Sequence, residues 1–284
     1  MNACIAFLPI NTSKTMTSQD ELRILQRIAQ AIERLAPQPE PLAEVKSADC
    51  FSWSRQEKQL LPLLDTRPMP LAQLQGIDEA RDVLLANTRQ FARGFRANHA
   101  LITGPAGSGK SALVQAVWAE VNRGVTDPLK RVALVEIKRQ DLASLPQLVH
   151  ALQGWVIRRF IIVCEDARFE QADAAQQALL GTLEGGLAPL PDHLVIYATA
   201  PTPASPAELA LHERFGLQLG LPAFDLESYV ALVTYLALQH KLPISPEELQ
   251  REASSWVEKR GAHHGRVAWH FIVDLAGRLG KKLA

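Results

Sequence analysis

The sequence predicts an α/β protein in which a parallel β-sheet lies between helices, followed by a small all-helical domain. Three observations lead to this prediction. Short apolar segments alternate with helical patterns from Asp78 to Leu219, an order typical of a parallel sheet covered on both faces. A glycine-rich loop ending in lysine and serine follows the first of these apolar segments. Beyond Pro222 only helical patterns remain.

Length and composition limit the classes of protein. The chain has 284 residues, 47% of them hydrophobic, which is enough for one good-sized domain with a smaller companion. Lys+Arg and Asp+Glu number 30 each, so the basic balance that indicates nucleic acid or an anionic membrane is absent. Three separated cysteines (Cys4, Cys50, Cys164) form no CxxC pair, which favours a reducing cytoplasm over a disulfide framework or zinc site.

Residues 1–45 are expected to form an N-terminal helix and a proline-rich linker. Apolar residues recur at helical spacing from Ser18 to Leu35, before three closely spaced prolines that make a stiff connector. Met16 directly precedes this helix, so we expect translation to begin there and residues 1–15 to be a gene-start artefact. Docking on another protein and packing on its own domain both remain open for the helix.

The α/β domain is expected to span residues 46–222 and the helical domain residues 223–284. Phe51 and Trp53 are expected to pack against the main domain in a stretch that prolines keep largely non-helical up to Leu74. Asp78 is the expected N-cap of the first helix. The predicted helices are 78–95, 110–123, 141–153, 172–183, 225–240, 246–260 and 265–279, and the predicted strands are 99–103, 131–137, 159–164, 193–198 and 217–219.

The glycine-rich loop is the strongest functional signal. Gly104-Pro105-Ala106-Gly107-Ser108-Gly109-Lys110-Ser111 fits G-x-x-x-x-G-K-[ST] between a predicted strand and a predicted helix, the context that a phosphate-binding loop requires. Glycines let successive N–H groups converge on the β-phosphate, and the following helix adds its partial positive charge. Lys110 is expected to bridge the β- and γ-phosphates and Ser111 to ligate Mg²⁺. A glycine-rich turn with an incidental lysine is the alternative.

Two carboxylates follow the most apolar strand. Glu165 and Asp166 come directly after residues 159–164, where a P-loop enzyme needs one carboxylate for Mg²⁺ and a group that orients water. A solvated acidic turn is the alternative. No NKxD motif occurs, which favours ATP over GTP.

The chain resembles the AAA+ ATPases and, more closely, the bacterial family known as domain of unknown function 815, from about Phe51 to the C-terminus. The loop alone indicates only the P-loop superfamily. The other matching segments are Gly76–Asp78, Asn87–Arg89, Cys164–Glu170, Leu183–Leu187, Ile196–Thr199, Glu213–Leu217 and Gly265–Ala268.

The resemblance implies roles for individual residues. Glu165 is implied as the outer-sphere Mg²⁺ group and Asp166 as the group that polarises water, although AAA+ proteins usually show Asp then Glu. Thr199 stands at the end of the sensor-1 strand, but Ala200 and Pro201 replace the expected Asn, which favours slow hydrolysis. Ala112 completes the implied nucleotide contacts.

Two arginines are implied to act on the nucleotide from outside the loop. Arg214 matches the arginine finger that reaches the γ-phosphate of a neighbouring subunit, which implies a homo-oligomer; a surface arginine paired with Glu213 is the alternative. Arg266 matches the sensor-2 arginine of the helical lid. His263 and His264 lack a further metal ligand nearby and are interpreted as loop residues. Trp155, Trp256 and Trp269 are expected to pack in the core or the lid.

The expected function is hydrolysis of ATP-Mg²⁺ at a subunit interface, coupled to work on an unidentified protein client. An ATP-binding switch with little turnover is the first alternative. A small-molecule P-loop kinase has no use for the finger or the lid arginine. A DNA loader would need a positive charge that the neutral composition does not supply.

Overall fold

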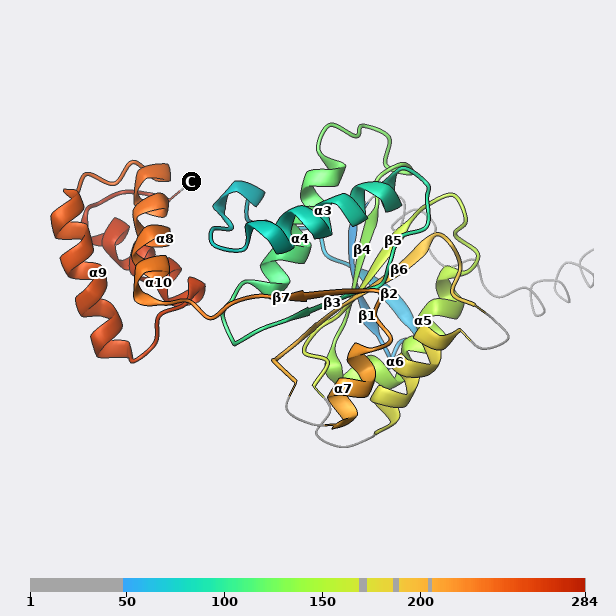
Figure 1. The fold of residues 1–284 in the computed structure, drawn as a ribbon. Helices are drawn as coiled ribbons and strands as arrows, with labels where there is room; N and C mark the ends of the chain where they lie inside the picture. The colour runs from blue at the N-terminus through green and yellow to red at the C-terminus, as the bar shows by residue number, and fades with distance from the viewer. Residues whose placement is uncertain (1–47, 169–172, 186–188, 204–205, 284) are drawn as a thin grey trace, which may run out of the picture. The chain divides into compact units, whose positions relative to one another are not determined.

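The computed structural model describes residues 48–168, 173–185, 189–203 and 206–283 (Figure 1). The expected N-terminal helix, its proline linker and the start at Met16 lie outside the described residues, as do parts of two segments that match the expected family. The chain divides into two compact units, Met1–Ala43 and Glu44–Ala284. All features described below belong to the second unit.

Seven strands form one sheet in the order β2-β1-β4-β5-β6-β3-β7. All neighbours pair in parallel except β1 and β2, which are antiparallel. The predicted parallel sheet between helices is therefore confirmed, with one antiparallel edge added. The strands are β1 (Cys50–Ser54), β2 (Gln59–Pro62), β3 (Ala100–Thr103), β4 (Ala133–Ile137), β5 (Phe160–Cys164), β6 (Leu194–Ala200) and β7 (Leu217–Gly220).

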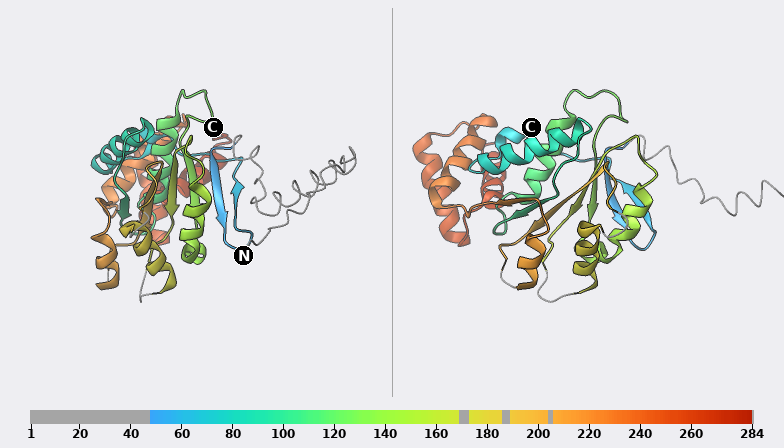
Figure 2. Two further views of the ribbon diagram at one scale, coloured as in Figure 1. Left: turned by 90° about the vertical axis from the view of Figure 1, so that its right-hand side faces the viewer. Right: turned by 45° about the vertical axis from the view of Figure 1, so that its right-hand side comes forward.

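The hairpin β1–β2 is the main element that the sequence interpretation missed. It forms the edge of the sheet beside β4, drawn in blue in Figure 2. Phe51 of β1 lies opposite Val135 of β4. The expected packing of Phe51 and Trp53 on the main domain is confirmed, because both side chains are buried in the core. The indole Nε1 of Trp53 also donates a hydrogen bond of 2.8 Å to Ser144 Oγ.

Helices cover both faces of the sheet, with α3 and α4 on one face and α5, α6 and α7 on the other (Figure 1). The predicted helix 141–153 begins as a 3₁₀-helix and becomes α-helical at Leu145, with proline in its first turn. Helix α7 was not predicted. These helices are η1 (Leu71–Gln73), α3 (Asp78–Ala92), α4 (Lys110–Asn122), η2 (Arg139–Ser144), α5 (Leu145–Leu152), α6 (Ala174–Glu184) and α7 (Pro206–His212).

The expectation that Asp78 caps α3 was wrong. Ile77 is the N-cap residue and makes no side-chain capping bond. Asp78 lies in the first turn, where its carboxylate forms an ion pair of 2.5 Å with Arg81. A carboxylate in the first turn still interacts favourably with the positive end of the helix dipole, which explains why an acidic residue occurs at the start of this helix.

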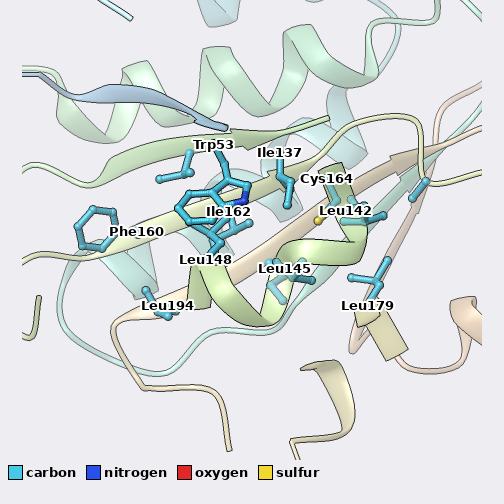
Figure 3. Packing of buried hydrophobic residues seen from close by; sticks show 14 of the residues in the cluster. Trp53, Ile137, Leu142, Leu145, Leu148, Phe160, Ile162, Cys164, Leu179 and Leu194 are labelled. Carbon is cyan, nitrogen blue, oxygen red and sulfur yellow. The ribbon is translucent and has the colours of Figure 1, made fainter. Parts of the chain in front are cut away.

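Strand β5 is buried along its whole length. Phe160, Ile162 and Cys164 belong to the core under α5 and α6, which Figure 3 shows around Trp53 and Leu148, whereas Ile161 and Val163 belong to the core under α3 and α4. Burial on both faces is typical of a central parallel strand. The end of β5, where Glu165 follows, is consequently held between two packed layers.

Three helices follow the sheet, α8 (Leu226–Gln239), α9 (Pro246–Arg260) and α10 (Gly265–Arg278). They surround their own apolar core, which includes Tyr229 and Phe271. The carboxylate of Asp225 caps α8 by accepting from the Ser228 N–H at 2.7 Å. The predicted domain division after Pro222 falls between β7 and α8, and the domain bounds stay predictions.

Among the described residues, every helix is too short or too polar to cross a membrane.

Candidate functional site

The glycine-rich loop connects β3 to α4, and three of its glycines have positive φ angles. These angles are +148° at Gly104, +77° at Gly107 and +97° at Gly109, which is the N-cap of α4. Space is restricted as well: a Cβ atom at Gly104 would lie 2.7 Å from the Leu221 carbonyl oxygen. Both the backbone angles and the close approach therefore require glycine.

Lys110 folds back over this loop. Its Nζ donates to the carbonyl oxygens of Gly104 at 2.8 Å and Pro105 at 2.7 Å. Partial burial lowers the pKa of Lys110, against the charges of Asp166 and Glu165, which raise it. A cation held inside the curl of the loop, partly desolvated, is positioned to attract an anion.

Two hydroxyl groups converge on one carboxylate oxygen of Glu165. Ser111 Oγ, at the start of α4, donates to Glu165 Oε2 at 2.7 Å, and Thr199 Oγ1, near the end of β6, donates to the same oxygen at 2.9 Å. The neighbouring pairing of β5 with β6 brings Glu165 and Thr199 together. Hydroxyl and carboxylate oxygens are the hard ligands that Mg²⁺ prefers, so this group fits a magnesium site.

Asp166 adopts a left-handed backbone conformation with φ of +51°. Its N–H donates to Thr199 Oγ1 at 3.2 Å, while its carboxylate is mostly exposed and lies 3.9 Å from the Arg168 guanidinium. This conformation is uncommon outside glycine, although Asp tolerates it better than most residues. The turn directs the backbone of Asp166 to Thr199 and leaves its carboxylate accessible.

A cavity of about 430 Å³ brings most of the predicted site residues together. Ala106 to Ala112, Glu165, Asp166 and Thr199 line its polar part, and Arg266, in the first turn of α10, also lines the cavity. Gly104 and Pro105 stand at the base of the loop, where their carbonyls hold Lys110.

The apolar part of this cavity was missed by the sequence interpretation. The segment before α3 and the helical region both contribute to it, and Trp269, expected only to pack, is one of its walls. The one sequence signal was the family-like segment Gly76–Asp78, which includes Ile77. The remaining apolar lining residues are Met69, Leu74, Phe224, Leu232 and Leu236.

Arg214 does not line the cavity. Its Nε lies 2.8 Å from Glu184 Oε1 at the end of α6, and both side chains are about half exposed. The alternative that Arg214 pairs with Glu213 was therefore wrong, because its partner is Glu184. His263 and His264 do not belong to a metal-binding cluster among the described residues, because no three His, Cys, Asp or Glu side chains there are placed to hold a metal ion.

Solved structures that match part of this chain include RuvB from Thermotoga maritima. One RuvB mutant gives a TM-score of 0.46 at 15% identity, covering 73% of this chain and 72% of that one. Another structure, of RuvB described as a Holliday junction branch migration motor, gives a TM-score of 0.43 at 16% identity, covering 75% of this chain and 72% of that one. No curated protein matches the chain.

The strand order and the loop establish the fold class from the chain itself. Strands β4-β5-β6-β3-β7 lie in parallel, the phosphate-binding loop joins β3 to α4, and a helical region follows. This is the fold of an AAA+ P-loop ATPase. The family described as "Protein of unknown function (DUF815)" matches residues 46–203 and 201–279, and this chain belongs to that family.

Proposed function

We propose that this protein binds ATP with Mg²⁺ at the loop from Gly104 to Ser111 and hydrolyses it. The observation that supports this proposal most strongly is the convergence of Ser111 and Thr199 on Glu165 in the wall of the cavity. A loop of this type needs a hydroxyl and a carboxylate side by side for the metal ion. Here the two groups come from different elements and already lie within hydrogen-bond distance.

The loop and the charged groups of the cavity have separate roles in this proposal. The N–H groups of the loop and the N-terminus of α4 bind the phosphates, and Lys110 leaves its two carbonyl partners to contact the β- and γ-phosphates. Ser111 and Glu165 hold Mg²⁺, which supplies charge neutralisation on the phosphate oxygens. Asp166 orients the attacking water, and Arg266 contacts the phosphates from the helical region.

The apolar part of the cavity is the proposed site of the base. Leu74 and Ile77 come from the segment before α3 and Trp269 comes from α10, and apolar and aromatic walls are typical of the sites that bind a planar base. Trp269 then provides a spectroscopic signal, because a base that packs beside the indole changes its fluorescence.

Equilibrium binding of ATP tests the proposal. We expect Lys110→Ala to weaken ATP binding at least tenfold by calorimetry, because the loop loses its cation. The exposed Lys130, whose nearest carboxylate is 4.0 Å away, provides the control variant Lys130→Ala, which should bind like the native chain. In Trp269→Phe the change in tryptophan fluorescence on addition of ATP should largely disappear, while ATP binding remains measurable by calorimetry. ATP binding that is equal in native protein and Lys110→Ala would contradict the proposal.

We further propose that hydrolysis takes place between subunits and is coupled to work on a protein client. Arg214 lies outside the cavity of its own chain and is about half exposed, which suits a residue that reaches the γ-phosphate of a neighbour. To do so it must leave Glu184. A half-exposed ion pair contributes little to stability, so exchange of Glu184 for a phosphate is energetically accessible.

An ATP-binding switch with little turnover is the second candidate. It is favoured by the exposed Asp166 carboxylate and by Ala200 and Pro201 in place of the expected Asn after Thr199. This candidate requires nucleotide-dependent assembly with negligible phosphate release. Turnover that disappears in Asp166→Asn would exclude it.

A further inference from the structure

His264 of the helical region is in direct contact with the phosphate-binding loop. A Cβ atom placed on Gly107 would lie 2.5 Å from His264 Nδ1, 2.7 Å from Cγ and 3.0 Å from Cε1, so the Nδ1 corner of the ring points at this glycine. A Cβ atom on Gly265 would lie 3.3 Å from the Gly107 carbonyl oxygen. The start of α10 therefore contacts Gly107, the fourth residue of the loop, through both the His264 ring and Gly265.

The Nδ1 atom of His264 is buried and has no hydrogen-bond partner among the described residues. An unsatisfied buried polar atom is unfavourable and requires an explanation. Burial lowers the pKa of His264, and the neighbouring charges of Arg266, His263 and His270 act in the same direction, against an interaction with its own backbone that raises the pKa. The imidazole is consequently neutral near pH 7, and in one of its tautomers Nδ1 carries a proton that it can donate.

We propose that His264 is a nucleotide-binding residue whose Nδ1–H donates to the β-phosphate held by Gly107. The inference rests on the proposed function and adds a residue to it. In loops of this type the backbone N–H groups converge on the β-phosphate, so this phosphate is the acceptor that comes nearest to Gly107. Because ADP and ATP share the β-phosphate, His264 stabilises contact between the helical region and the loop with either nucleotide.

Binding of ADP and ATP to the full chain, measured by calorimetry, tests this inference. We expect His264→Ala to weaken both nucleotides about tenfold, since hydrogen bonds to charged groups are among the stronger ones. His264→Asn should recover most of the affinity, because its amide can donate from nearly the same position. The exposed neighbour provides the control: His263→Ala should stay within twofold of the native protein.

Several outcomes would overturn the inference. Affinities of His264→Ala within twofold of native would remove any binding role. His264→Asn as weak as His264→Ala would indicate that the ring only packs, and a loss confined to ATP would exclude the β-phosphate as the acceptor. If His264→Ala does not fold, as judged by its thermal unfolding, His264→Asn alone decides. If nucleotide binding by the native chain does not depend on Lys110, both the proposed function and this inference are overturned. If binding depends on Lys110 but the His264 variants bind nucleotide as tightly as the native chain, only this inference is overturned.

Discussion

Thr199 holds two parts of the candidate site with one hydroxyl group. Its Oγ1 donates to Glu165 and accepts from the Asp166 N–H, and its side chain is buried. We expect Thr199→Val, which keeps the shape and removes the hydroxyl, to lower the free energy of unfolding by about 1–3 kcal/mol and to weaken Mg²⁺-dependent ATP binding. Urea unfolding and calorimetry measure the two effects.

The matched control for Thr199 is Thr182 in α6. Its hydroxyl donates only to the Ala178 carbonyl one turn earlier, so Thr182→Val should change neither quantity appreciably. Equal effects of the two variants would indicate that Thr199 contributes only as a packed side chain.

His99 gives the structure a dependence on pH. Its Nδ1 accepts a hydrogen bond of 3.1 Å from the Ile196 N–H, and burial lowers its pKa below the ordinary value of 6.5. The unfolded chain therefore binds more protons as the pH falls below about 6.5, and stability falls with it. We expect His99→Asn, whose side-chain oxygen can accept the same bond, to lose less stability than the native chain between pH 7.5 and pH 5.5. Identical losses in urea unfolding would contradict this assignment.

Individual residues were predictable where a local pattern carried them. The loop from Gly104 to Ser111 follows a fixed spacing, and Glu165 directly follows an apolar strand. The contact of His264 with the loop and the place of Trp269 in the cavity wall were missed because both join segments that are far apart in the chain. Periodicity describes which face of a helix is buried, but it does not say which distant segment that face meets.

At the scale of elements, β1 is attached to the sheet by a buried ion pair as well as by its backbone. Arg158 is almost completely buried, and its guanidinium pairs with Asp49 at 2.5 Å and donates to the Ala48 carbonyl at 2.8 Å. We expect Asp49→Asn to lower the free energy of unfolding by about 3 kcal/mol or more, because a buried charge loses its counter-charge. Urea unfolding measures the change.

Asp65 provides the matched control for Asp49. It also pairs with an arginine, Arg67, but both of these side chains are more than three-quarters exposed, at 80% and 84%. Asp65→Asn should therefore change stability by less than about 0.5 kcal/mol. Similar losses in the two variants would mean that burial of the Asp49 pair does not decide its contribution.

Elements with a sustained apolar run or helical period were predicted, and elements without one were not. Apolar runs identified β3 to β7, and helical spacing identified α8 to α10. The hairpin β1–β2 was missed because its loop contains no glycine and reaches a positive φ at Lys58 instead, so it lacks the usual turn residues. Helix α7 has only seven residues, too few for a clear apolar period.

For the whole molecule, the class of fold was predictable because alternation of strands and helices restricts the topology of the chain. The edge on which β1 is placed was not predictable, since strand order depends on long-range pairing. The contact of α10 with Gly107, which joins the helical region to the loop, was not predictable from the sequence either. These long-range contacts shape the cavity, and the proposed subunit interface adds Arg214 to it.

ATP turnover per subunit, measured over a range of protein concentrations, tests the central claim that this chain is an ATPase whose site is completed by a neighbour. We predict that turnover per subunit rises with concentration and falls at least about a hundredfold in Lys110→Ala and in Arg214→Ala. The exposed Arg251 provides the control variant Arg251→Ala, which should behave like the native chain. A mixture of the two inactive variants should recover part of the activity, because an intact loop then meets an intact finger. Turnover that is independent of concentration and unchanged in Arg214→Ala, or the absence of turnover in the native chain, would contradict the account.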